Sequence, residues 1–255
     1  MNLLVVYPGR FHPFHLGHKA SYDYLVKKYG ADNVYIVTSD IQAPMTSPFS
    51  YADKVAMMTK LGIPAGHIVK VKNPYQPKEI TDNLPDETKN NTALIFAVSE
   101  KDMTSDGARF KFGTKKNGEP SYMQPMPENL KQLQPLTQHA YVDVTPTVNF
   151  RVKGADANSA SEIRKRYIAG NDADRDQIIT DLYGTYYPEL RDIFDSKLGI
   201  AEKAQEFVKE ARSTRTPAAL RVLEKLLMLE RAAHDCGPTE VLLEDYIEEK
   251  RSRKI

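Results

Sequence analysis

The stretch LLVVYPGRFHPFHLGH, residues 3–18, decides the fold of this chain. It begins with an apolar run that is typical of a strand buried on both faces of a parallel sheet. Pro8 and Gly9 end that strand, and apolar side chains then recur at helical spacing over residues 19–29. The stretch therefore predicts a strand, a turn and a helix, which is the repeating unit of α/β sheets.

The same alternation of strands and helices continues to about residue 150. A capping box formed by Ser50 and Asp53 predicts a helix that ends near Leu61. Strands separated by helices predict a parallel sheet with right-handed crossovers and helices on both faces. We therefore expect an α/β fold, a Rossmann-like doubly wound parallel five-stranded sheet, with a C-terminal helical extension. The further strands are predicted at residues 34–37, 68–71, 93–98 and 141–144.

Two regions depart from this alternation and define the expected domains. Residues 103–138 lack periodicity and are rich in Gly and Pro, which predicts a flap or hairpin insertion with a turn at residues 116–118. Helical patterns dominate from Ser159 onward. We therefore expect an α/β domain over residues 1–170 and a helical C-terminal extension over residues 171–255.

The charge and cysteine content argue against several classes of protein. Lys and Arg number 35 against 34 Asp and Glu, and the net charge of +1 argues against a broad nucleic-acid-binding surface. Cys236 is the one cysteine of the chain and cannot form an internal disulfide. No apolar run approaches the ~20 residues needed to cross a bilayer, and the first residues lack a signal-peptide pattern. We expect a cytoplasmic protein without nucleic-acid or membrane partners.

The turn after the first strand combines residue types that bind phosphate. It lies at the carboxyl end of a strand, where open α/β sheets bind ligands, and it leads into a helix N-terminus, which favours anions. Gly9 and Gly17 would let the backbone approach a ligand closely. His15 and His18 can donate hydrogen bonds to developing negative charge, and Arg10 adds a forked cation. The turn is thus predicted to bind a phosphorylated ligand.

The histidines of this stretch also invite comparison with a metal site. His12, His15 and His18 recur every three residues, a spacing that could align them on one helix face. Pro13 and Gly17 are expected to break any such helix. We therefore interpret the histidines as hydrogen-bond donors, and we expect no direct protein ligands to a metal.

The stretch resembles the H-x-G-H signature of the nucleotidyltransferase superfamily that is related to class I aminoacyl-tRNA synthetases. H-x-G-H alone is a short motif. The longer form G-R-F-x-P-x-H-x-G-H, at residues 9–18, is specific in its strand–turn–helix context and is most similar to archaeal-type nicotinamide mononucleotide adenylyltransferases. The resemblance covers roughly residues 3–170.

The second signature of that superfamily, I-S-x-T-x-x-R, is matched late in the domain. Residues 158–164 read NSASEIR, in which Ser161 takes the place of Thr and Asn158 that of Ile. Ser159 and Glu162 form a capping box, which independently predicts a helix start there. Two separate signatures in the expected order strengthen the resemblance.

The resemblance implies adenylyl transfer, in which a phosphate oxygen of an acceptor attacks the α-phosphorus of ATP and releases pyrophosphate. It assigns catalytic roles to His15, His18 and Arg164. Mg²⁺ would be bound mainly by the phosphates and water, so no carboxylate cage is expected. Lys101 and Asp102 resemble the family's turn near the adenosine and are expected nucleotide or acceptor contacts. The residues expected to bind the nucleotide and its phosphates are Gly9, Arg10, Phe11, Gly17, Ser159 and Ser161.

The sequence leaves alternatives for the acceptor and for the role of the chain. The resemblance favours nicotinamide mononucleotide, but the Trp on which the family stacks the cationic ring is absent. RVKG at residues 151–154 resembles part of a cytidylyltransferase motif, so CTP or another acceptor is an alternative. Another is a nucleotide-binding scaffold or assembly protein that acts through its C-terminal helices, which could also form homo-oligomer contacts. Aromatic replacements for the Trp are Tyr75, Phe110, Tyr122 and Tyr141.

Overall fold

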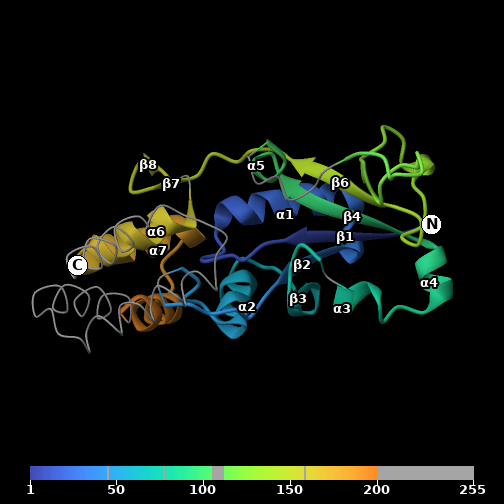
Figure 1. Cartoon of the computed structure of the whole chain (residues 1–255). Coiled ribbons are helices and arrows are strands. Elements are labelled where there is room, and N and C mark those ends of the chain that lie inside the picture. Colours follow the sequence, from blue (N-terminus) through green and yellow to red (C-terminus); the bar gives the residue numbers. More distant parts are fainter. Residues whose placement is uncertain (45, 77, 105–111, 158, 200–255) are drawn as a thin grey trace, which may run out of the picture.

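The central feature of the structure is a parallel sheet. The computed structural model describes residues 1–199 apart from 45, 77, 105–111 and 158 (Figure 1). In this part of the chain, six parallel strands have the order β3-β2-β1-β4-β6-β5. They are β1 (Asn2–Pro8), β2 (Val34–Thr38), β3 (Ile68–Lys70), β4 (Thr92–Ser99), β5 (Met123–Pro125) and β6 (Ala140–Thr145), and a separate antiparallel hairpin is formed by β7 (Arg151–Val152) and β8 (Ala155–Asp156).

Helices connect the strands and continue beyond the sheet. α1 leads from β1 to β2, and α2 leads from β2 to β3. No helix among the described residues is long and apolar enough to cross a membrane. The helices are α1 (Leu16–Tyr29), α2 (Tyr51–Lys60), α3 (Lys78–Thr81), α4 (Asp86–Asn90), α5 (Lys101–Thr104), α6 (Ala160–Ala169) and α7 (Asp172–Tyr183), the 3₁₀ turns are η1 (Ala31–Asn33), η2 (Ala65–His67) and η3 (Leu130–Gln132), and residues 188–199 are also helical.

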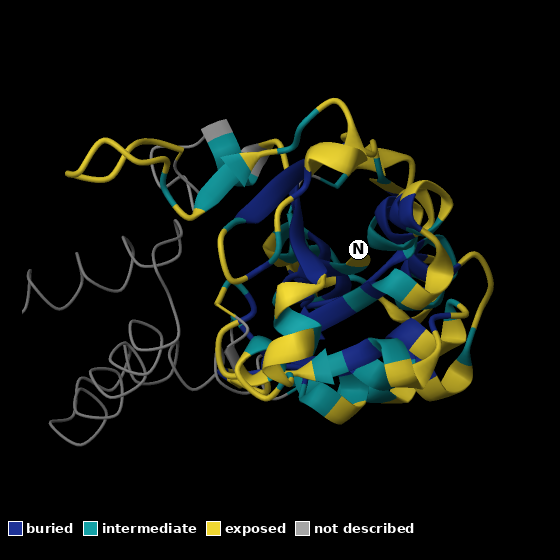
Figure 2. Cartoon of the chain, turned by 90° about the vertical axis from the view of Figure 1, so that its right-hand side faces the viewer, coloured by how far each residue is buried: buried dark blue, intermediate teal, exposed yellow. Residues whose placement is uncertain are grey.

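The sheet is buried on both faces, as a doubly wound sheet requires. Alternate residues of each strand enter one of two hydrophobic clusters, so that Val5 of β1 packs with α1 and α2 while Val6 packs on the opposite face. The second face also contacts Ile80 of α3 and Met103 of α5. Figure 2 shows the buried strands at the centre and the exposed sides of the helices around them.

The carboxyl ends of the strands point toward one end of the molecule. There β1, β4 and β6 run toward α6, α7 and the β7–β8 hairpin, while the N-terminus and α4 lie at the other end (Figure 1). The strand order reverses between β1 and β4, which makes their carboxyl ends the expected ligand-binding position.

The structure confirms the doubly wound parallel sheet and its five predicted strands, and it adds a sixth. β5 is three residues long and lies inside the segment predicted to be a flap or hairpin. It pairs with β6. Its sequence, Met-Gln-Pro, has no β-branched residue, so propensity does not reveal it. The predicted turn at residues 116–118 is present, because the amide of Gly118 donates to the carbonyl of Lys115 and Thr114 is bridged to Pro120.

Helix α1 begins earlier than its apolar pattern indicates. The pattern predicted a start at Lys19, whereas the helix begins at Leu16. The reason is an unusual cap: Nδ1 of His15 accepts a hydrogen bond of 3.1 Å from the amide of Gly17. Gly17 therefore lies inside the first turn and does not break the helix, contrary to the prediction.

Helix α7 and the helical residues 188–199 pack into the same core as the sheet. Phe194 is fully buried, and its ring centroid lies 4.9 Å from that of Phe49 and 5.1 Å from that of Tyr167 in α6. Residues 171–199 thus share the core of the α/β domain, although they lie beyond its predicted boundary. The remainder of the predicted helical extension lies outside the described residues.

Candidate active site

His15 is fixed at the N-terminus of α1 by its own helix. It is the N-cap residue, and because its Nδ1 accepts from the amide of Gly17, its neutral ring carries the proton on Nε2. A Cβ at Gly17 would lie 2.9 Å from Cε1 of His15, so a larger residue would collide with the ring. Gly17 is therefore needed to make room for His15.

His18 lies beside His15 in the first turn of α1. The two ring centroids are 4.0 Å apart, and the His18 ring also packs on Phe14 at 5.4 Å and against the edge of Phe11 at 5.1 Å. Nδ1 of His18 is buried and has no hydrogen-bond partner among the described residues. A buried polar atom of this kind is costly unless a ligand satisfies it.

Both imidazoles are held in the neutral form. Burial lowers the pKa of His15 well below its usual value, and the charge of His18 lowers it further. Burial also lowers the pKa of His18, to about 4. At neutral pH the pair therefore offers neutral N–H groups, which can donate hydrogen bonds to an anion without an electrostatic cost from two adjacent cations.

Acid is expected to destabilise the fold through His18. Its pKa falls from 6.5 to about 4 on folding, so the unfolded chain binds the extra proton between these values. The free energy of unfolding should be unaffected by this group above pH 6.5 and fall by up to about 3 kcal/mol toward pH 4. Urea denaturation across this range should show a smaller loss for His18→Gln than for the wild type. Parallel curves would contradict the assignment.

Phe11 packs against the ring of His18, and contact of Phe11 with a nucleotide stays a prediction. Its φ is 50°, in the left-handed region that non-glycine residues rarely adopt, and its ring is buried. A Cβ at Gly9 would lie 2.4 Å from this ring, so Gly9 makes room for Phe11. The close contacts of Gly9 and Gly17 are thus with aromatic rings of this chain, and contacts of these residues with a nucleotide stay a prediction.

Residues 159–164 of the second signature form the start of helix α6, as predicted. The side chain of Ser159 caps the helix by accepting from the amide of Glu162 at 3.2 Å. The hydroxyl oxygens of Ser159 and Ser161 are 3.0 Å apart, and Ser161 is exposed. Two hydroxyls therefore stand together at a helix N-terminus, an arrangement suited to phosphate oxygens.

Arg164 joins the two signatures. The residue is 7% exposed, and Nη1 of its guanidinium donates to the backbone carbonyl of His12 at 2.5 Å. Nε is buried without a hydrogen-bond partner among the described residues. Burial lowers the pKa of Arg164 to about 10, and the positive charge of Arg10 contributes to the lowering. Arg10 and Arg164 are therefore close enough to repel each other, and an anion between them would relieve that repulsion.

Lys54 completes this group and was missed by the sequence analysis. It is fully buried in α2, and Nζ donates to the carbonyl of Ser39 at 2.7 Å and contacts the hydroxyl of Thr38 at 3.3 Å. Burial lowers its pKa to about 8; nearby carboxylates oppose this lowering and Arg10 adds to it. We refer to Arg10, Lys54 and Arg164 as the cationic cluster. The signal was available, because Lys54 occupies the buried helix face with Met57 and Met58.

The predicted nucleotide contacts after β4 are only partly described. Oδ2 of Asp102 accepts hydrogen bonds from the amide of Ser99 at 3.2 Å and from its hydroxyl at 2.7 Å. This places Asp102 at the carboxyl end of β4, on the same edge of the sheet as the histidines. The side chain of Lys101 lies outside the described residues. Contacts of both residues with a nucleotide stay predictions.

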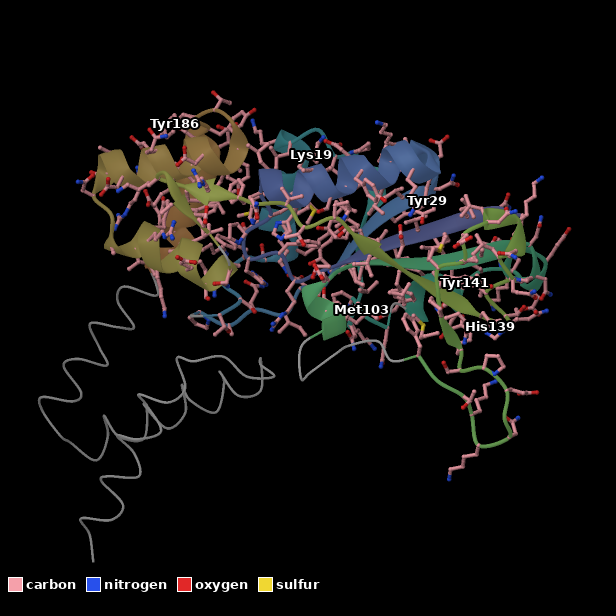
Figure 3. The ribbon with its side chains drawn as sticks, turned by 90° about the horizontal axis from the view of Figure 1, so that it is seen from above. Lys19, Tyr29, Met103, His139, Tyr141 and Tyr186 are labelled. Atoms are coloured by element: carbon pink, nitrogen blue, oxygen red, sulfur yellow. The ribbon has the colours of Figure 1, made fainter. Side chains whose placement is uncertain are left out.

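The aromatic residues that could stack on the ring of the acceptor lie in different parts of the structure. Tyr141 is buried near the amino end of β6. In Figure 3 it lies close to His139 and far from Met103 of α5. Tyr122 precedes the amino end of β5, and its hydroxyl donates to the carbonyl of Leu136. Tyr75 follows the carboxyl end of β3 and is half-buried, and Phe110 lies outside the described residues. Tyr75 is thus the described candidate on the ligand-binding edge.

Direct binding of a metal ion by the protein would require a cluster of metal-ligating side chains. Within the described ranges, no three His, Cys, Asp or Glu side chains gather in a way that could hold a metal ion. His12 is turned to a structural contact, in which its Nδ1 accepts from the amide of Phe49 at 3.4 Å. Binding of Mg²⁺ through phosphates and water stays a prediction.

The chain is similar in sequence to one protein family and to a curated protein. The sequence model of the cytidylyltransferase-like family matches residues 6–166, more than half of the chain. A nicotinamide-nucleotide adenylyltransferase of Sulfurisphaera tokodaii is 34% identical over 55 residues, which are 22% of this chain and 32% of that protein. The chain thus matches about a third of the length of this curated relative.

Two solved structures of a bifunctional NMN adenylyltransferase/ADP ribose pyrophosphatase from Francisella tularensis are similar to this chain. One, a complex with AMP and a manganese ion, is 14% identical with a TM-score of 0.43, and the other is 16% identical with a TM-score of 0.46. Both matches cover 85% of this chain, and they cover 57% and 58% of those proteins. The family match includes both signature segments, and it confirms the superfamily that they predicted. The chain therefore belongs to the cytidylyltransferase-like family of the nucleotidyltransferase superfamily.

Proposed function

We propose that this protein transfers the adenylyl group of Mg–ATP to the phosphate of nicotinamide mononucleotide, which yields NAD and pyrophosphate. The observation that carries the proposal is the hydrogen bond from Arg164 to the carbonyl of His12, since it joins the two signatures at one place. Adenylyl transfer requires donors for the leaving phosphates beside donors for the reacting phosphorus. The name of the Sulfurisphaera tokodaii relative, a nicotinamide-nucleotide adenylyltransferase, supports adenylyl transfer to this acceptor.

The reaction would proceed by in-line displacement at the α-phosphorus. An oxygen of the acceptor phosphate forms a bond to the α-phosphorus, and the bond from that phosphorus to the bridging oxygen of the β-phosphate breaks. The electron pair of the broken bond leaves with pyrophosphate. The attacking phosphate is already ionised near pH 7, so no general base is needed, and catalysis rests on positioning and charge stabilisation.

Different residues of the site would contact different phosphates of the substrates. The neutral N–H groups of His15 and His18 would donate to oxygens of the α-phosphate as its charge changes, because they are preorganised and shielded from water. The cationic cluster and the hydroxyls of Ser159 and Ser161 would hold the remaining phosphate oxygens. Bound Mg²⁺ supplies charge neutralisation on the phosphates.

The pKa of Lys54 gives a pH-dependent test of the cationic cluster. Lys54 is charged below its pKa of about 8, so its attraction for phosphate should be lost as the pH rises through that value. We expect kcat/KM for ATP or for the acceptor to fall above pH 8 in the wild type. Lys54→Arg should remove this fall, because its guanidinium stays charged. Lys54→Met should lower kcat/KM about tenfold below pH 8, and the difference from the wild type should shrink above pH 8, where Lys54 is itself uncharged. Equal profiles for the wild type and Lys54→Arg would contradict this role.

Activity is tested by pyrophosphate release from a panel of nucleotides and acceptors. We expect the highest kcat/KM with Mg–ATP and nicotinamide mononucleotide, and NAD as the product identified by mass. CTP is the matched control for the base, and nicotinamide riboside, which lacks the phosphate, is the control for the attacking group. A preference for CTP would show that the protein transfers a cytidylyl group, and CTP would then replace ATP as the proposed donor. Release of pyrophosphate with no acceptor-derived product would overturn it.

A further inference from the structure

Phe150 lies directly on the ring of His15. The two ring centroids are 4.3 Å apart and the planes are inclined by 18°, so the rings are stacked. Cβ of Phe150 is also 3.4 Å from the position that a Cβ at Gly17 would take. The contact matters for His15 because its hydrogen bond to Gly17 fixes one nitrogen but leaves the plane of the ring to be set by its neighbours.

The β7–β8 hairpin holds Phe150 in place. Phe150 immediately precedes the hairpin, and its carbonyl accepts from the amide of Ala157, just after the hairpin, at 2.8 Å. The turn consists of Lys153 and Gly154, both in the left-handed region with φ values of 53° and 73°, as a tight two-residue turn requires. Val152 is fully buried. The hairpin is therefore a closed unit with Phe150 at its base.

Helix α6 clamps this hairpin through Arg166. The guanidinium of Arg166 donates to three backbone carbonyls of the hairpin, at 3.0 Å to Val152, 3.1 Å to Ala155 and 2.6 Å to Asp156. Helix α7 adds a second attachment, because the amide of Lys153 donates to Asp181 at 2.7 Å and its ammonium pairs with Asp174. The hairpin is thus attached to both α6 and α7.

We propose that the β7–β8 hairpin is a positioning element, in which Phe150 sets the plane of the His15 ring and Arg166 ties that setting to helix α6. This proposal rests on the proposed function, because adenylyl transfer supplies the reacting phosphate toward which the His15 ring would be oriented. Arg164 and Arg166 of the same helix then have complementary tasks. Arg164 reaches the H-x-G-H turn directly, and Arg166 reaches it through Phe150.

The kinetic test compares Phe150→Leu with Phe150→Tyr. Phe150→Leu keeps apolar volume but removes the ring, and it should lower kcat about tenfold with KM for ATP within twofold, because the N–H of His15 is no longer aimed. Phe150→Tyr should restore most of the rate. Arg166→Ala should reduce kcat in the same direction, and Tyr24→Leu, which removes an exposed ring from α1, should change it less than twofold.

Two further measurements separate positioning from other roles of Phe150. In a His15→Ala background, Phe150→Leu should cause no further loss of kcat, whereas an undiminished loss would overturn the proposal. A rise in KM for ATP with unchanged kcat would show instead that Phe150 stacks on the nucleotide. Nitrogen-15 NMR of the His15 ring needs no turnover. The Nε2–H form should be present in both proteins, because the amide of Gly17 holds Nδ1, but the ring signals should be sharp in the wild type and broadened or multiple in Phe150→Leu, because the plane of the ring is no longer set. Identical spectra would overturn the proposal whether or not adenylyl transfer is observed.

Discussion

Replacing His18 by alanine should lower kcat by about 10²- to 10³-fold, the usual loss when one preorganised donor to a reacting oxyanion is removed. His18 is in a position to act as such a donor, because its ring lies 4.0 Å from that of His15 and its Nδ1 is buried without a partner among the described residues. KM for ATP should change much less, since the lost interaction is stronger in the transition state than in the ground state.

The control for this experiment lies on the same helix. Lys27→Ala alters the last turn of α1, at the end opposite His18, and should leave kcat within twofold of the wild type. Circular dichroism and urea denaturation would show that both variants are folded. A folded His18→Ala variant with full turnover would contradict the assignment of the histidine pair to the reaction.

Replacing Phe194 by alanine should lower the free energy of unfolding by about 3–5 kcal/mol, as expected for a large aromatic side chain in a packed core. Phe194 is fully buried between Phe49, which precedes α2, and Tyr167 of α6. The cavity would lie between the segment that carries Lys54 and the helix that carries Arg164. We therefore also expect a loss of kcat/KM under conditions in which the variant is still folded.

Asp192→Ala is the matched control for the effect of Phe194 on stability. Asp192 is exposed on the same helical segment, and its replacement should change the free energy of unfolding by less than about 0.5 kcal/mol. Urea denaturation followed by far-UV circular dichroism measures both variants. A loss below about 1 kcal/mol for Phe194→Ala would show that residues 188–199 do not stabilise the domain as their packing indicates.

The sequence predicted the sheet well because its strands are nearly continuous apolar runs. A run such as residues 93–98 of β4 is apolar on both faces and is therefore typical of a strand in the middle of a parallel sheet. The apolar pattern alone was enough to predict this position. β5 was missed because three residues without β-branching carry no such pattern, and its strand state depends on pairing with β6. The early start of α1 was missed because His15 acts as its cap, which propensity does not predict.

The candidate site was predictable where residues act within one short segment. The pairing of His15 with His18 and the cap at Ser159 both depend on residues less than one helical turn apart. Phe150 could not be found in this way, because its contact with His15 depends on how the hairpin docks on α6 and α7. Lys54 was recognisable in principle as a charged residue on an apolar helix face, but only the fold shows that it lies close to Arg10.

The fate of the phosphates of ATP tests the central claim most directly. The protein would be incubated with nicotinamide mononucleotide and Mg–ATP that is labelled either in the α-phosphate or in the γ-phosphate. We expect the α-label to appear in NAD and the γ-label to appear only in pyrophosphate, with both products formed about 10²- to 10³-fold more slowly by His18→Ala. Transfer of the γ-label to the acceptor would indicate a kinase. Retention of both labels in intact ATP, with a folded wild-type protein, would contradict the account.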